Sequence, residues 1–248
     1  MSPDTIGHPT ARGLADGMVL PTHAMKVMLF GASGMVGQGV LRECLLDDGV
    51  DKVLAIGRRP SGCTHSKFSE IVLADLTRIE ALGSVLEGYD ACFDSLGISS
   101  AGLTEADYAQ QTYDLTLTIA KALVSRNPAM TFIYVSGAGT DSSELGRVMW
   151  ARVKGRTENA LLVLPFKAAY MFRPGVIQPL RGVRSKTSSY QIFYSLTRPL
   201  LPLLRAMIPS TILTTEVMGQ AMLAVARRGA AKSVLEAADI NAIAAQKA

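Results

Sequence analysis

Short apolar runs and amphipathic stretches alternate along most of the chain. The runs hold three to five residues each and end at glycine, proline or a polar residue, as buried strands do. We predict strands at residues 27–30, 53–56, 71–73, 91–93, 132–135 and 168–172. Because these strands are apolar at consecutive positions, both of their faces must be covered, which is typical of a parallel sheet between two layers of helices.

Helical spacing fills several of the intervals between these strands. Apolar residues recur at the spacing of one helix face over residues 36–46 and predict a helix there. A second helix is expected from Thr104, as its N-cap, to Ser125, and a third over residues 146–164, where Pro165 stops it. The alternation predicts an α/β fold, a doubly wound parallel sheet of the Rossmann type with a small C-terminal cap.

Two regions break this alternation and define the expected domain boundaries. Residues 1–24 carry neither an element pattern nor the features of a signal peptide, so we expect a flexible N-terminal extension there. A single domain is expected over residues 25–248. Within it, residues 175–210 are rich in proline, arginine and serine and are predicted to cap a substrate site.

The C-terminal part also bears on partners. The apolar stretch at residues 190–209 is interrupted by Arg198, Pro199 and Pro202, which argues against an integral membrane segment. We favour the interpretation that this stretch forms a lid or a contact between two subunits. The alternative is that it associates with a membrane surface. Apolar segments at 200–208 and 217–225 make a homodimer possible.

Composition narrows the class of protein further. The 248 residues, 48% hydrophobic and 19% charged, suffice for one substantial core. The net charge of +4 is scattered without basic runs, so no nucleic-acid binding is expected. The three cysteines form no CxxC pair and favour a reducing, cytoplasmic location. The three histidines lack ligand spacing, so we predict no metal site.

A glycine-rich loop follows the first predicted strand and opens the first helix. Glycines at positions 31, 34 and 37 allow a tight turn and a close approach, and the helix N-terminus offers backbone NH groups to a pyrophosphate. A tight connection selected only for packing is the alternative. We predict that a dinucleotide binds along Gly31, Ser33, Gly34, Met35, Val36 and Gly37.

The end of the second strand indicates which dinucleotide. An NAD enzyme usually has an acidic residue there, whereas this chain has Arg58 and Arg59, which suit the 2′-phosphate of NADP(H). NADP(H) is therefore preferred over NAD(H), unless these arginines are merely solvated. After the third strand, Asp75 and Leu76 could contact the adenine, or Asp75 could cap the next helix instead.

Several short segments together resemble an atypical short-chain dehydrogenase/reductase over residues 26–178. The similarity is greatest to epimerase-like NAD(P)-binding proteins and to Tat-interacting-protein oxidoreductases. It rests on the order of the glycine loop, Ile56-Gly57-Arg58-Arg59, Ser95-Leu96-Gly97, Val135-Ser136 and Phe172-Arg173-Pro174-Gly175.

This resemblance implies roles for the later segments. Leu96 and Gly97 are expected to lie along the cofactor, and Pro174 and Gly175 to bring backbone close to the nicotinamide, although a plain strand-exit turn remains open at 173–175. Ser136 is implied to position the substrate; capping of the following turn is the alternative.

The family's Tyr-x-x-x-Lys motif is altered in this chain. Lys154 matches the lysine, which in the family holds the nicotinamide ribose, but Trp150 occupies the tyrosine position. An indole NH does not ionise and cannot exchange the proton that a phenol does. Lys154 could alternatively be a solvated lysine, and Trp150 could pack in the core or stack at the substrate pocket.

The altered motif leaves three functions open. We expect an oxidoreductase that moves hydride between NADP(H) and a small carbonyl or alcohol, with Ser136, Lys154 and Trp150 at the catalytic site. Its acid role is then lost, moved to Tyr190 or Tyr194 of the cap, or supplied by water. The alternatives are a non-catalytic NADP(H)-sensing protein and a nucleotide-sugar epimerase-like enzyme.

Overall fold

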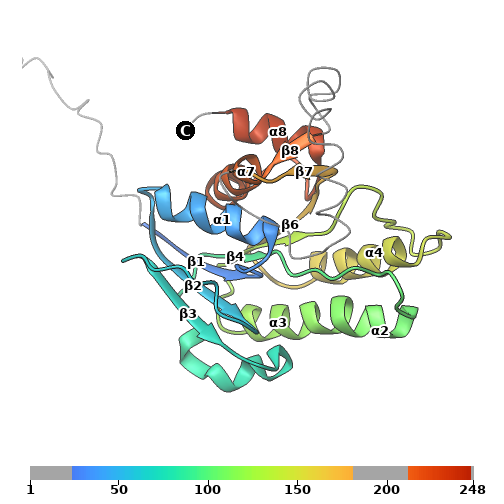
Figure 1. The fold of residues 1–248 in the computed structure, drawn as a ribbon, viewed down its shortest axis with the longest axis horizontal. Helices are drawn as coiled ribbons and strands as arrows, with labels where there is room; N and C mark the ends of the chain where they lie inside the picture. Colours follow the sequence, from blue (N-terminus) through green and yellow to red (C-terminus); the bar gives the residue numbers. More distant parts are fainter. Residues whose placement is uncertain (1–23, 181–211, 247–248) are drawn as a thin grey trace, which may run out of the picture.

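A seven-stranded, entirely parallel sheet forms the centre of the molecule (Figure 1). The structure is a computed structural model and describes residues 24–180 and 212–246. The strand order is β3-β2-β1-β4-β5-β6-β9, so the chain reverses its direction of travel between β1 and β4. The strands are β1 (Met25–Phe30), β2 (Val50–Gly57), β3 (Phe68–Val72), β4 (Ala91–Asp94), β5 (Thr131–Val135), β6 (Ala168–Arg173) and β9 (Val234–Glu236).

Helices cover both faces of the sheet (Figure 1). One layer consists of α1 (Met35–Leu46), α7 (Thr215–Arg228) and α8 (Ala237–Ala245). The opposite layer consists of η1 (Leu76–Leu86), α2 (Glu105–Ala109), η2 (Gln110–Asp114), α3 (Leu115–Val124) and α4 (Met149–Leu162). Alternate residues of β1 supply the two cores, because Val27 and Leu29 pack under α1 whereas Met28 and Phe30 pack under α3.

The doubly wound α/β fold predicted from the sequence is confirmed. All six predicted strands correspond to β1 to β6, and Thr104 is the N-cap of α2, where its hydroxyl accepts a hydrogen bond from the Asp107 amide at 3.2 Å. The helix that follows is not uniform, because its middle turn, η2, is a π-helix. The third helix begins at Met149 rather than at Gly146, whose amide donates to Asp141 Oδ2 at 2.6 Å.

The predicted cap lies mostly outside the described residues. Its first part contains β7 (Val176–Gln178), which pairs in parallel with β8 (Ile212–Thr214) in a separate two-stranded sheet. Residues 181–210 of the predicted cap, including Tyr190 and Tyr194, lie outside the described ranges, as does the predicted extension up to residue 23. No helix within 24–180 and 212–246 is long and apolar enough to cross a membrane.

Candidate functional site: a cleft at the carboxyl ends of the strands

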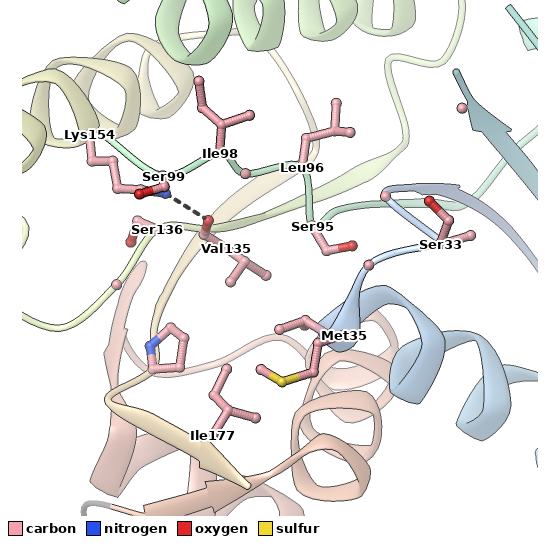
Figure 2. A pocket seen from close by; sticks show the side chains of 18 of the residues that line it. Ser33, Met35, Ser95, Leu96, Ile98, Ser99, Val135, Ser136, Lys154 and Ile177 are labelled. Carbon is pink, nitrogen blue, oxygen red and sulfur yellow. Dashed lines mark hydrogen bonds between the residues drawn. The ribbon is translucent and has the colours of Figure 1, made fainter. Parts of the chain in front are cut away.

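A cavity lies where the strand order reverses. It has a volume of about 950 Å³ and opens beyond the carboxyl ends of β1, β4, β5 and β6 (Figure 2). In doubly wound sheets this crevice is the usual place for a nucleotide ligand. Its lining comes from residues 31–36, 55–59, 95–100, 135–138, 174–175, Ile177, Glu70, Tyr108, Trp150 and Lys154.

The glycine loop forms one wall of this cavity. Gly31 has φ +82°, and a Cβ on it would lie 2.7 Å from the backbone oxygen of Ser95, so both conformation and space require glycine. Gly34 is the N-cap of α1 and provides no side-chain cap, which leaves the first amides of the helix directed at the cavity. All predicted loop residues line the cavity except Gly37, which packs beneath Gly31.

Of the residues predicted to bind the adenosine part of the cofactor, only some line the cavity. Arg58 and Arg59 are exposed residues of the cavity wall directly after β2. Glu70 of β3 lies at the same end, and its Oε1 accepts a hydrogen bond from the Ser61 amide at 2.8 Å. The sequence prediction missed Glu70, because the third strand was expected to begin only at Ile71.

Asp75 and Leu76 are not among the cavity-lining residues. β3 ends at Val72, and the Asp75 side chain accepts hydrogen bonds from the amide and the hydroxyl of Thr77 at 3.0 and 2.6 Å. These hydrogen bonds hold the pKa of Asp75 below its ordinary value. Asp75 therefore caps η1, which is the alternative that the sequence left open, and the buried Leu76 belongs to the core, so the structure gives no support to the predicted adenine contacts.

The opposite end of the cavity collects the residues expected at the nicotinamide. Ser136 follows β5, and its hydroxyl donates to the Phe172 carbonyl at 3.1 Å. Lys154 of α4 donates from Nζ to the Val135 carbonyl at 3.4 Å (Figure 2). Trp150 lies one helical turn before Lys154, on the same face of α4. Figure 2 shows Lys154 and Ser136 on one side of the cavity and Ser33 and Met35 on the other.

Two backbone segments complete this end. Leu96 and Gly97 line the cavity after β4, and Pro174 and Gly175 line it after β6. The Pro174 carbonyl accepts a hydrogen bond from the Ala138 amide at 2.8 Å, which ties the loop after β5 to the loop after β6. The structure therefore brings Leu96, Gly97, Pro174 and Gly175 to the same cavity as the glycine loop.

Trp150 both lines the cavity and covers the loop after β5. Its ring lies 3.7 Å from the position that a Cβ on Gly139 would take. It is half-buried and forms part of the cavity wall. Lys154 is also half-buried, and burial lowers its pKa to about 8 against the charges of Asp94 and Glu158.

The sequence prediction missed a buried carboxyl group beside Lys154. Asp94, the last residue of β4, is fully buried, and its Oδ1 accepts a hydrogen bond from the Leu96 amide at 2.9 Å. Burial raises its pKa to about 6, against the Leu96 amide, the charge of Lys154 and the hydroxyl of Thr116. The signal in the sequence was a single acidic residue that ends an otherwise apolar strand.

Chemically, the cavity offers amides and guanidinium groups at one end and a lysine and a serine at the other. The first set suits the phosphates of a dinucleotide, and the second suits a polarised carbon–oxygen bond. Within residues 24–180 and 212–246, no group of His, Cys, Asp and Glu side chains has the arrangement of a metal site.

Comparison with known proteins agrees with this geometry. Residues 31–161, more than half of the chain, match the family model described as NAD(P)H-binding. Among curated proteins, the chain is 30% identical to "Protein FMP52, mitochondrial" of Eremothecium gossypii, over 65% of this chain and 70% of that protein. It is 27% identical to "Protein HTATIP2" of Rattus norvegicus, over 61% of this chain and 62% of that protein.

Solved structures show the same fold. The enzyme WbmF of Bordetella bronchiseptica, solved with NAD⁺, superposes with a TM-score of 0.64 over 89% of this chain and 77% of that chain, at 14% identity. Other neighbours include an ADP-L-glycero-D-manno-heptose-6-epimerase of Helicobacter pylori and an oxidoreductase of Burkholderia thailandensis described as of the short-chain dehydrogenase/reductase family. The expected resemblance to this superfamily is confirmed.

The comparisons contradict the predicted cytoplasmic location. Several curated relatives are named mitochondrial, so the cytoplasmic location inferred from cysteine usage is wrong. Unpaired thiols argue against an oxidising compartment and do not distinguish among the reducing compartments.

The glycine loop, the cavity at the strand reversal and the family match over residues 31–161 together establish that the chain belongs to the NAD(P)H-binding family of Rossmann-fold proteins.

Proposed function

We propose that this protein is an NADP(H)-dependent oxidoreductase that acts on a small carbonyl compound or alcohol. The observation that carries the proposal is one continuous cavity of about 950 Å³ with the glycine loop at one end and Ser136 and Lys154 at the other. A dinucleotide laid along it places its pyrophosphate at the N-terminus of α1. Its nicotinamide then faces the serine and the lysine.

The residues of this chain have separate tasks in that arrangement. The cofactor supplies or accepts hydride, and the protein supplies binding and orientation. The hydroxyl of Ser136, now donating to the Phe172 carbonyl, can rotate to donate to a substrate oxygen instead. Leu96, Pro174 and Trp150 are the lining residues that exclude water at this end.

A preference for NADP(H) is supported by the two arginines after β2. Both guanidinium groups are exposed at the cavity wall, where a 2′-phosphate can accept charge-assisted hydrogen bonds. Glu70 lies at the same end, and its hydrogen bond with the Ser61 amide anchors the loop that follows Arg59. The carboxylate thus supports the loop that carries the arginines.

Removal of these arginines is expected to weaken binding of NADPH selectively. For Arg58→Ala and Arg59→Ala, we expect the Kd of NADPH to rise roughly 10- to 100-fold, as loss of one charge-assisted hydrogen-bonding group implies. The Kd of NADH should change less than about 3-fold, because NADH has no 2′-phosphate. Titration monitored by energy transfer from Trp150 to the bound nicotinamide measures both constants.

Arg78→Ala is the matched control for these variants. Arg78 is an exposed arginine of η1 that does not line the cavity, so its removal subtracts the same charge from the surface. Equal weakening of NADPH and NADH binding would mean that the arginines act through their charge in general and not through a contact with the 2′-phosphate. An unchanged Kd for NADPH in both variants would remove the basis for the preference.

A non-catalytic NADP(H)-sensing protein is the second candidate, and Trp150 is the observation that favours it. Trp150→Tyr restores a phenol one helical turn from Lys154, so a carbonyl reductase should gain rate. We expect kcat/KM for carbonyl reduction to rise at least about 10-fold, since a positioned general acid contributes roughly 10²- to 10⁴-fold. NADPH consumption with a panel of small aldehydes and ketones measures the gain.

Trp150→Phe separates the phenol from the loss of the indole. Equal rates in the tyrosine and phenylalanine variants would show that the hydroxyl contributes nothing. Activity that appears only with tyrosine would favour the sensor, because the natural chain would then bind the cofactor without turning over.

A further inference from the structure

A buried charge pair lies below the nicotinamide end of the cavity. Asp94 ends β4, and its partner across the sheet is Tyr134 of β5. The ring of Tyr134 lies under the ammonium group of Lys154, with 5.3 Å between Nζ and the ring centroid. A fully buried carboxyl group is costly unless a cation or several donors compensate for the lost hydration.

The Leu96 amide and the Thr116 hydroxyl compensate only in part for the burial of Asp94. Oδ1 accepts from the Leu96 amide, whereas Oδ2 makes no hydrogen bond with any other part of the described chain. Lys154 is the cation whose charge stabilises the ionised form of Asp94, and the charge of Asp94 in turn stabilises the ammonium form of Lys154. The two groups therefore act as counter-ions.

The other ionisable groups around Lys154 do not take over this task. Glu158 lies one helical turn further along α4, but both of its oxygens bind the guanidinium group of Arg173. Tyr134 and Tyr108 are buried phenols, and burial raises the pKa of Tyr134 well above its ordinary value, so it stays neutral. Asp94 is thus the carboxylate left to balance Lys154.

Lys154 retains the capacity to donate into the cavity. Its ammonium group carries three protons, and its described hydrogen bond, to the Val135 carbonyl, is long at 3.4 Å. Ser136 follows Val135 directly, so the ammonium group and the serine hydroxyl adjoin the same end of the cavity. Trp150, where the family has tyrosine, offers no ionisable proton there.

We propose that Lys154 itself donates the proton to the substrate oxygen, and that Asp94 is the positioning residue that keeps the ammonium group of Lys154 charged. This inference rests on the proposed oxidoreductase function. In the reductive direction, the carbonyl carbon gains a C–H bond from the hydride of the dihydronicotinamide while the C=O π bond breaks. The resulting alkoxide takes a proton from Nζ of Lys154, which becomes a neutral amine and regains a proton from water.

The balance is one carbonyl, one reduced cofactor and one proton converted to one alcohol and one oxidised cofactor. With the pKa of Lys154 at about 8 and that of Asp94 at about 6, both groups are charged near pH 7. Asp94→Asn removes the negative charge that raises the pKa of Lys154, so that pKa should fall. The amine then loses its proton near neutral pH and can no longer act as an acid.

The pKa of Lys154 can be measured without turnover. Trace acetylation of the purified protein with acetic anhydride at a series of pH values, followed by mass spectrometry of the peptide that contains Lys154, gives the midpoint at which the amine becomes reactive. We expect a midpoint near 8 in the natural protein. In Asp94→Asn it should lie about one to three pH units lower, as loss of a nearby opposite charge implies.

Asp90→Asn is the matched control. Asp90 directly precedes β4, at the opposite end of that strand from Asp94, where its Oδ2 accepts from the Lys26 amide at 2.7 Å. Its removal subtracts the same charge about 13 Å away along the strand, so the midpoint of Lys154 should not move. Should Asp94→Asn fail to fold by circular dichroism, Asp94→Ser removes the charge with less bulk and keeps an acceptor for the Leu96 amide.

Turnover provides the second readout. The kcat for carbonyl reduction should fall as the pH rises through the pKa of Lys154, and in Asp94→Asn this fall should move to lower pH with the labelling midpoint. The Kd of NADPH should stay within about 3-fold, since this pair lies at the opposite end of the cavity from the glycine loop that we expect to bind the phosphates.

Two results would overturn the inference. A labelling midpoint that is the same in Asp94→Asn and in the natural protein would mean that Asp94 does not control Lys154. Retention of kcat in Lys154→Met at saturating NADPH would mean that the proton comes from elsewhere. Failure of the natural protein to bind either nucleotide is a different result. It would contradict the proposed function, while the labelling would still show whether Asp94 controls the pKa of Lys154.

Discussion

Glu158→Ala is expected to lower the free energy of unfolding by about 3–5 kcal/mol, the usual cost of removing one partner from a buried ion pair. Glu158 is fully buried on α4, and Nε of Arg173 donates to its two oxygens at 3.0 and 3.2 Å. Without the carboxylate, the Arg173 guanidinium stays largely buried beside an empty space. Its other partners are Ser142, at 2.6 Å, and the exposed carboxylate of Glu236.

Urea unfolding monitored by Trp150 emission measures this loss, and Glu105→Ala is the control. Glu105 pairs with Arg152 at 2.5 Å, but half of its side chain is exposed, so its removal should cost less than about 1 kcal/mol. Equal losses in the two variants would contradict the expectation. Replacing both Glu158 and Arg173 with methionine should recover part of the stability, since the buried charge then disappears as well.

The ion pair also links two elements at the Lys154 end of the cavity. Arg173 is the last residue of β6, and Pro174 and Gly175 of the cavity wall follow it directly. Glu158 is one helical turn beyond Lys154 on α4. Their pairing therefore joins the helix that carries Lys154 to the strand that leads into Pro174 and Gly175.

The central strands were predictable from the sequence because burial on both faces produces uninterrupted apolar runs. β9 was not, since its three residues are too few to show a pattern and its place is set by pairing with β6. The start of α4 was predicted three residues early. Gly146 there donates its amide to Asp141 Oδ2, a side-chain interaction that competes with the helix and that apolar spacing cannot reveal.

The candidate site likewise has parts that the sequence predicts and parts that depend on tertiary packing. The glycine loop is a local structure between a strand and a helix, so its spacing and its neighbours in the sequence were enough to predict the tight turn at the helix N-terminus. Asp94 had no such signal, because its chemistry depends on Lys154, which is distant in sequence and comes close only through packing of α4 on the sheet. For Asp75 the sequence left open whether it contacts adenine or caps the next helix, and the structure shows that it caps the helix.

Gly37→Ala is expected to raise the Kd of NADPH by roughly 100-fold or more, as loss of about 3 kcal/mol of phosphate contacts implies. A Cβ on Gly37 would lie 2.0 Å from the backbone oxygen of Gly31 and 2.9 Å from Oγ of Ser95. Alanine suits a helix, so the obstacle is space rather than conformation. The backbone at Gly31 must therefore move, and the amides at the N-terminus of α1 lose their alignment with the pyrophosphate.

Gly39→Ala separates this effect from a general disturbance of α1. Its Cβ would lie 2.5 Å from Cβ of Thr215, so it crowds the packing of α1 against α7 and leaves the loop alone. Both variants should lose stability in thermal unfolding, but Gly39→Ala should keep the Kd of NADPH within about 3-fold of the natural value. Since the two substitutions add the same methyl group to one helix, natural affinity in Gly37→Ala would mean that the cofactor does not rest on this loop, whatever else the cavity binds.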